Sequence, residues 1–101
     1  MKKKKLNLKS IKKIKDAGIQ VVMLTGDSYK TALSISKELK IVTSEKDIIL
    51  TSEEFNQMSD QAVTNKLSDI KVLCRSLPSD KLRFVLMIVG RPLLILEFIM
   101  L

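Results

Sequence analysis

The chain lacks several residue types on which enzymes and metal sites commonly depend. Its 101 residues contain no histidine and a single cysteine, Cys74. A disulfide framework, a zinc site of cysteine and histidine, and catalysis by histidine are therefore excluded within these residues. Aromatic residues make up only 4% of the chain, so we expect no aromatic platform for stacked bases. We expect a reducing compartment, with Cys74 as a small buried strand residue.

Charge of one sign is concentrated at the N-terminal end. The formal net charge is +7, and residues 1–15 hold eight lysines and no acidic residue. The lysines at 2–5 could attract nucleic acid or an anionic lipid surface, or could form a solvated terminus. No apolar segment follows them as in a signal peptide. The apolar C-terminal run is too short to span a bilayer, and Gly-Arg-Pro at 90–92 interrupts it.

Apolar periodicity predicts helices that alternate with strands along the chain. We expect helices over 8–17, 28–40, from 51, from 59 to about 67, and from 78 to about 89. We expect strands over 19–24, 47–50, 71–75 and 93–98. The alternation predicts an α/β fold with a mostly parallel sheet and flanking helices. The hydrophobic fraction of 46% is enough for one modest core.

Three of the expected helices have recognisable first turns. Thr51 and Glu54 have the spacing of a capping box, and Ser59 is a suitable N-cap. Pro78 suits the first helical position, and Asp80 suits the positive end of the helix dipole. These residues support the predicted starts of the helices.

The run "VVMLTGD" at 21–27 is a buried apolar strand that stops at a hydroxyl, a glycine and a carboxylate. In open α/β sheets, ligands bind at the carboxyl ends of strands, beside helix N-termini that favour anions. Thr25 can donate to a phosphoryl oxygen, and Gly26 permits close approach of a backbone. Asp27 can hold a ligand hydroxyl, or Asp27 or Ser28 can cap the next helix. Taken alone, the three residues fit a phosphate site or an ordinary strand-turn-cap.

Three longer stretches resemble P-type cation-transporting ATPases, in the order and spacing of that family. They are "IKKIKDAGIQVVMLTGDSYKTALSISKELKI", "ILTSEEFNQMSD" and "VLCRSLPSDKLRFV", and together they cover about residues 8–85. The second resembles calcium-type members. The resemblance implies part of a phosphorylation domain with a haloacid-dehalogenase-like, Rossmann-like fold. In such pumps this is a cytoplasmic domain of a membrane protein, and the rest of the pump chain is its partner.

The resemblance also implies roles for five residues. Thr25 and Gly26 would contact the transferred phosphoryl group, and Lys81 would neutralise charge beside it. Asp27 and Arg75 would contact the nucleotide. The alternatives are a solvated Lys81 in a first helical turn and an Arg75 that merely ends a strand. The family uses ATP and magnesium, and we expect this chain to bind neither stably.

Two motifs of the family are missing from the 101 residues. DKTGT, which carries the phosphorylated aspartate, is absent, and so is GDGxND, which supplies magnesium ligands. We therefore divide the chain into a basic tail at 1–7, a partial phosphorylation domain at 8–90 and a divergent apolar tail at 91–101. A truncated chain, a degenerate gene and a frame-shifted end all fit this pattern. Because the strand with the nucleophile is missing, we expect residues 93–98 to pair beside 19–24, in a sheet of four strands at most.

Two other functions fit parts of the sequence. A small basic module could bind an acidic partner through the lysines at 2–5 and the first helix, although no dedicated nucleic-acid motif is present. A small haloacid-dehalogenase-like phosphatase would need an aspartate nucleophile motif at its first strand, which the sequence lacks. The leading prediction remains a fragment of an ATP-driven cation pump that is inactive by itself.

Overall fold

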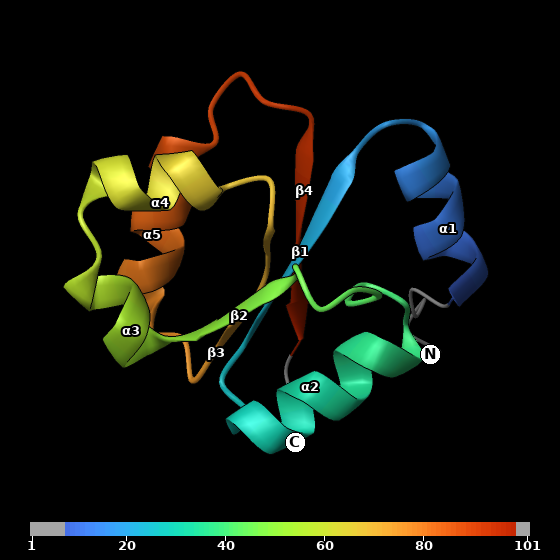
Figure 1. Cartoon of the computed structure of the whole chain (residues 1–101), viewed down its shortest axis with the longest axis horizontal. Helices are drawn as coiled ribbons and strands as arrows, with labels where there is room; N and C mark the ends of the chain where they lie inside the picture. The colour runs from blue at the N-terminus through green and yellow to red at the C-terminus, as the bar shows by residue number, and fades with distance from the viewer. Residues whose placement is uncertain (1–7, 99–101) are drawn as a thin grey trace, which may run out of the picture.

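The structure is a computed structural model that describes residues 8–98. This part of the chain contains five helices and four strands that largely alternate (Figure 1). The helices are α1 (Leu8–Asp16), α2 (Tyr29–Glu38), α3 (Ser52–Gln57), α4 (Asp60–Lys66) and α5 (Pro78–Met87). The strands are β1 (Gln20–Thr25), β2 (Ile48–Thr51), β3 (Ile70–Cys74) and β4 (Leu93–Phe98).

The four strands form one parallel sheet in the order β2-β3-β1-β4 (Figure 1). This arrangement confirms the predicted α/β, Rossmann-like class. Strand β4 pairs with β1 along its whole length, from Gln20 with Leu93 to Thr25 with Phe98. The prediction that residues 93–98 form a strand beside 19–24 is therefore confirmed. As a result, β1 is covered by a neighbouring strand on both sides.

Helices cover both faces of the sheet, so its inner strands are buried on both sides. Helices α1 and α2 lie on one face, and α3, α4 and α5 lie on the other (Figure 1). Val21 and Met23 of β1 belong to the core under α1 and α2. Val22 and Leu24 belong to the core under the other three helices. This explains why the sequence of β1 is a continuous apolar run instead of an alternating one.

The predicted helix starts are confirmed where a cap was expected. The Thr51 hydroxyl accepts from the Glu54 amide, the Glu54 carboxylate accepts from the Thr51 amide, and Ser59 caps α4. Several predicted ends were too late, including those of the helices expected over 8–17 and 28–40, which end at Asp16 and Glu38. Strand β3 stops at Cys74 because Arg75 has a φ of 51°, which an extended strand cannot contain. Helix α5 ends at Met87 instead of about residue 89.

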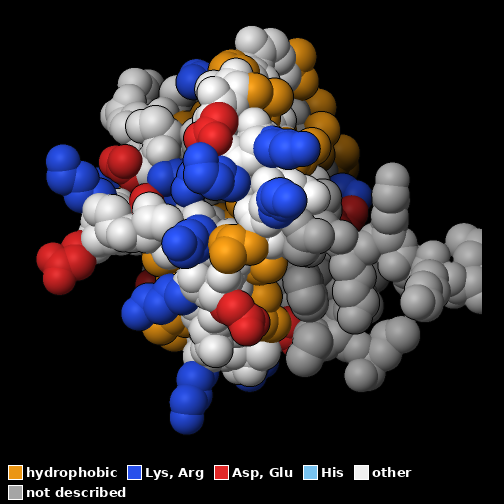
Figure 2. Space-filling view, turned by 90° about the vertical axis from the view of Figure 1, so that its right-hand side faces the viewer, with side chains coloured by type: hydrophobic (Ala, Val, Ile, Leu, Met, Phe, Trp, Pro, Cys, Tyr) orange, Lys and Arg blue, Asp and Glu red, His pale blue; other side chains and the backbone are white. Residues whose placement is uncertain are grey.

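The face that α1 and α2 cover is rich in lysine. Lys and Arg side chains gather near the middle of this face, and hydrophobic side chains gather toward its upper right (Figure 2). The lysines of the two helices are all exposed, namely Lys9, Lys12, Lys13, Lys15, Lys30 and Lys37. The basic tail predicted at 1–7 and the end of the apolar tail lie outside the described residues.

Candidate functional site

The Thr-Gly-Asp turn closes on itself at the carboxyl end of β1. The Thr25 hydroxyl donates to Oδ2 of Asp27 over 2.8 Å, and the Asp27 amide donates to Thr25 Oγ1 over 3.1 Å. Thr25 is buried, with 2% of its surface exposed. Asp27 does not cap the next helix: Ser28 does so, with its side chain accepting from the Thr31 amide. Of the two caps that the sequence allowed, the structure therefore uses Ser28.

Residues 75 and 76 are tied to the same turn by backbone hydrogen bonds. The Arg75 amide donates to the Asp27 carbonyl over 3.0 Å, and the Ser76 amide donates to the Thr25 carbonyl over 2.9 Å. The Ser76 hydroxyl donates to that carbonyl as well. Four predicted site residues, Thr25, Gly26, Asp27 and Arg75, thus lie at one edge of the sheet. The Arg75 side chain is exposed there.

Gly26 is the exposed residue of the turn, and its own surroundings do not require glycine. Its φ lies outside the left-handed region, and a Cβ built on it would meet no heavy atom within 4 Å. In contrast, Gly18 and Gly90 have φ values of 83° and 82°, which side chains rarely adopt. Open space therefore lies beside Gly26 at the end of β1.

A buried carboxylate fixes the start of α5 near this edge. Asp80 is 1% exposed and accepts hydrogen bonds from the Ser52 hydroxyl at 2.5 Å, the Asn56 amide group at 2.8 Å and the Leu77 amide at 2.9 Å. Burial alone would raise the pKa of Asp80, but these hydrogen bonds outweigh it and hold the pKa below its ordinary value of 3.8. Asp80 is therefore an anchored anion that positions its neighbour, Lys81.

Lys81, the fifth predicted site residue, forms an ion pair with Glu97 of β4. The two side chains are 46% and 49% exposed. Glu97 is the register partner of Leu24, one residue before the Thr-Gly-Asp turn. The pair therefore joins α5 to the carboxyl end of the sheet, beside the end of β1.

Searches against known proteins find relatives for most of the chain. A calcium-transporting ATPase of Listeria monocytogenes is 38% identical over 76 residues, which are 75% of this chain and 8% of the relative. Calcium-transporting ATPase 7, plasma membrane-type, of Oryza sativa is 41% identical over 73 residues, 68% of this chain and 7% of the relative. Calcium-transporting ATPase 1 of Saccharomyces cerevisiae is 31% identical over 77 residues, 75% of this chain and 8% of the relative.

This chain carries a segment of a P-type ATPase. It spans less than a tenth of the length of these relatives, so it matches only a small part of each of them. No protein-family model matches the chain. The prediction of a P-type ATPase fragment from the three sequence stretches is thereby confirmed.

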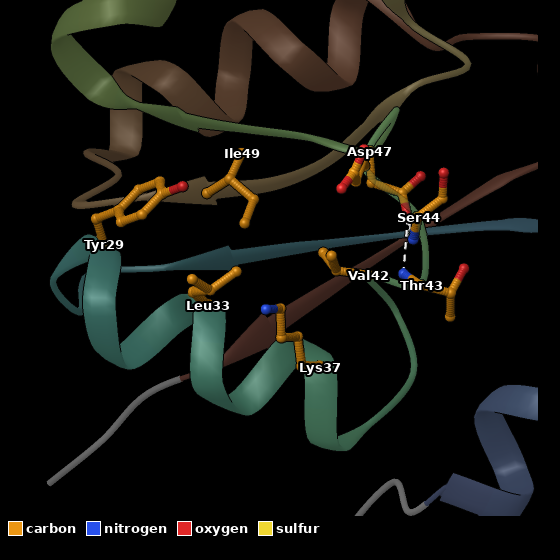
Figure 3. A pocket seen from close by; sticks show the side chains of 9 residues that line it. Tyr29, Leu33, Lys37, Val42, Thr43, Ser44, Asp47 and Ile49 are labelled. Atoms are coloured by element: carbon orange, nitrogen blue, oxygen red, sulfur yellow. Dashed lines mark hydrogen bonds between the residues drawn. The ribbon is translucent and has the colours of Figure 1, made fainter.

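A hollow on the described part of the chain lies away from the predicted site. It measures about 510 Å³ and opens between α2 and strand β2, at the edge of the sheet (Figure 3). Tyr29, Leu33 and Lys37 line it from α2, and Ile49 lines it from β2. None of the five predicted site residues lines this hollow.

Asp47 anchors the loop on one side of the hollow. Burial would raise its pKa, but hydrogen bonds from Lys71 and from the amides of Thr43 and Ser44 lower it below 3.8. The Lys71–Asp47 ion pair is mostly buried, with an N–O distance of 2.7 Å. The Asp47 carboxylate therefore holds the loop in place through its hydrogen bonds to Thr43, Ser44 and Lys71.

Two further features of residues 8–98 concern membrane-spanning helices and groups of metal ligands. No helix among them has the length and apolar content needed to cross a bilayer. No group of three acidic, histidine or cysteine side chains among them is arranged to hold a metal ion. Cys74 is buried as predicted, and that burial raises the pKa of its thiol, so the reactive thiolate is disfavoured.

Sequence reasoning missed the residues that support the predicted ones. Ser52 and Asn56 hold Asp80, and Glu97 pairs with Lys81. No local sequence motif predicts these contacts, because the partners are 16 to 28 residues apart in the chain. A search for polar residues at the carboxyl ends of neighbouring strands would have selected Glu97.

Proposed function

We propose that this chain is part of the phosphorylation domain of a calcium-type cation pump, with a haloacid-dehalogenase-like fold. In this proposal, Thr25 and Gly26 contact the phosphoryl group, and Lys81 neutralises its charge. Asp27 and Arg75 contact the nucleotide. ATP is the phosphoryl donor of the whole pump, and the rest of the pump chain is the partner of this segment.

One observation carries the proposal: four of the five residues meet at the carboxyl edge of a parallel sheet. The backbone bonds from Arg75 and Ser76 to the Thr25–Asp27 turn bring two distant motifs together there. The turn leads directly into α2, whose N-terminal amides and dipole favour an anion. The open space beside Gly26 leaves room for a phosphoryl group to approach the backbone.

The residues present do not fit a magnesium site. The described part of the chain has no cluster of three suitable ligands, and the sequence contains no GDGxND. Magnesium therefore has no part in the proposal for this chain. Its residues would bind and orient a phosphoryl group but would not accept one, because DKTGT is also absent.

Activity of the chain is the first test. We expect no acid-stable phosphoenzyme after incubation with ATP labelled on its γ-phosphate, because no family nucleophile is present. The chain is quenched in acid, separated and treated with hydroxylamine. A hydroxylamine-sensitive label on any aspartate would contradict the proposal that this chain only binds.

Binding of inorganic phosphate is the second and sharper test. We expect weak binding that shifts the amide resonances of residues 25–28 in a ¹H–¹⁵N NMR titration. Gly26→Ala should weaken this binding, because the methyl group fills the space beside the turn. The same change should leave the fold intact or stabilise it by about 0.4–1 kcal/mol, because glycine is not required there.

Lys81→Ala should also weaken phosphate binding, and Lys66→Ala is its matched control. Lys66 is an exposed lysine at the end of α4, next to Leu67, whose carbonyl contacts Gln20 at the amino end of β1. The control thus removes one positive charge from the opposite edge of the sheet. If Thr25→Ala, Gly26→Ala and Lys81→Ala all leave the affinity for phosphate unchanged, the Thr-Gly-Asp turn has only a structural role in this chain.

A second candidate function rests on the lysine-rich face in Figure 2. Helices α1 and α2 together expose six lysines, against the acidic residues Asp16 and Glu38. Such a surface would bind a polyanion with a steep dependence on salt. Binding to a mixed-sequence DNA duplex at several salt concentrations tests it. An affinity that is independent of salt, or unchanged when Lys9 and Lys13 of α1 are replaced by glutamine, would argue against it.

A further inference from the structure

The Lys81–Glu97 ion pair places a carboxylate where the proposed function requires an anion. Lys81 is the cation assigned to the phosphoryl group, and its only charged partner within residues 8–98 is Glu97. Strand β4 brings this carboxylate to the carboxyl end of the sheet, beside Leu24. The chain therefore supplies its own negative charge at the edge that the phosphoryl group would approach.

We propose that Glu97 is an internal competitor of phosphate: its carboxylate occupies Lys81 and keeps the phosphate site of this chain closed. This inference rests on the proposed function of Lys81. An incoming phosphate must displace Glu97 from the lysine and also approach a like charge. Both effects lower the affinity for phosphate.

Exposure of the pair makes the competition reversible. Both side chains are about half exposed, so water screens their attraction and the pair is weak. Phosphate carries more negative charge than a carboxylate, so it can replace Glu97 when its concentration is high. We expect the competition to change the affinity for phosphate by about fivefold, the range that a weak surface ion pair allows.

The position of α5 keeps Lys81 within reach of either anion. Its neighbour Asp80 is held by Ser52, Asn56 and the Leu77 amide, so the first turn of the helix is fixed. Glu97 sits on β4, which is hydrogen-bonded to β1 along six residue pairs. The lysine and the carboxylate are thus both presented by anchored backbone, and only their side chains need to move.

The test compares the full chain with Glu97→Gln, which removes the charge and keeps the shape of the side chain. Inorganic phosphate is titrated, and the resonances of residues 25–28 are followed by NMR. We expect Glu97→Gln to bind phosphate about fivefold more tightly. Glu38→Gln is the matched control, because it removes one negative charge from the exposed end of α2, and it should change the affinity by less than about twofold.

A double variant separates this inference from the proposed function. If Glu97→Gln tightens binding and Lys81→Gln added to it cancels the gain, Glu97 acts through Lys81. If Lys81→Gln alone weakens binding but Glu97→Gln has no effect, the competition is refuted and the phosphate role of Lys81 stands. If neither Lys81→Gln nor Gly26→Ala changes binding in the Glu97→Gln background, the proposed function itself fails.

Discussion

Replacing Asp80 by asparagine tests how this fold holds the start of α5. Asp80 is the buried acidic residue of the described chain, and its two oxygens accept three hydrogen bonds. Asparagine has nearly the same shape but carries one acceptor oxygen and one amide group. If its oxygen keeps the bonds from Ser52 and Leu77, its amide group faces the amide group of Asn56. One bond is then lost, and the remaining two lose the assistance of the charge.

The expected loss of stability follows from these contacts. A hydrogen bond to a charged group contributes about 1.5–3 kcal/mol, roughly twice a neutral one. Asn56 is exposed, so water can satisfy its amide group after the change. We therefore expect Asp80→Asn to lower the free energy of unfolding by about 2 kcal/mol. With a slope of about 2 kcal/mol per molar urea, the midpoint of unfolding falls by about 1 M.

Urea unfolding followed by circular dichroism measures this effect, with Asp69→Asn as control. Asp69 is exposed, and its carboxylate has no hydrogen bond to another described residue, so the control should stay within about 0.5 kcal/mol. The effect also depends on pH in a defined direction. Because the folded pKa of Asp80 lies below its ordinary value of 3.8, its contribution is complete above about pH 5 and is lost as pH falls further, through the lowered pKa of the folded state. Equal midpoints for Asp80→Asn and the parent chain at pH 7 would refute this reasoning.

Three further changes test the cap, the core and the added strand. Thr51→Ala removes the capping box of α3 and should cost about 1 kcal/mol in urea unfolding, whereas Thr51→Ser should cost little. Phe84→Ala removes a ring that is fully buried and meets the Phe55 ring edge-on with centroids 6.2 Å apart. Its cost of about 3–5 kcal/mol approaches the whole stability of a small domain, so cooperative thermal unfolding should be lost. Deleting residues 92–101 bares the edge of β1 and should lower the melting temperature or solubility; a better-behaved protein would contradict this.

Local signals predicted most of the elements of this fold. The capping box at Thr51, the cap at Ser59 and the apolar run of β1 each depend on neighbours in sequence, and each prediction is confirmed. The pairing of β4 with β1 was predicted because an apolar β-branched edge needs a cover. Less local features were misjudged: the strand expected over 71–75 stops at Cys74, because the backbone of Arg75 is left-handed.

The candidate site was less predictable because its contacts are tertiary. The sequence placed Asp80 at a helix N-terminus, as observed, but did not show that the fold also buries it against Ser52 and Asn56. Likewise, Lys81 was expected beside a phosphoryl group or in solvent, and it lies against Glu97. Such pairings depend on which helices and strands pack together in the folded chain, and residue spacing along the sequence does not encode that packing.

The order of strands in the sheet sets the order in which this chain can fold. Strand β1 is made before both of its neighbours in the sheet, β3 and β4. Met23 pairs with Val72 and Gln20 pairs with Leu93, so β1 cannot form these hydrogen-bonded ladders until the later residues have been synthesised. Contacts so far apart in sequence form slowly, and the first apolar strand stays unpaired meanwhile. A growing chain would therefore keep one side of residues 20–25 unpaired until β4 leaves the ribosome, and this apolar edge is open to pairing with another chain until then.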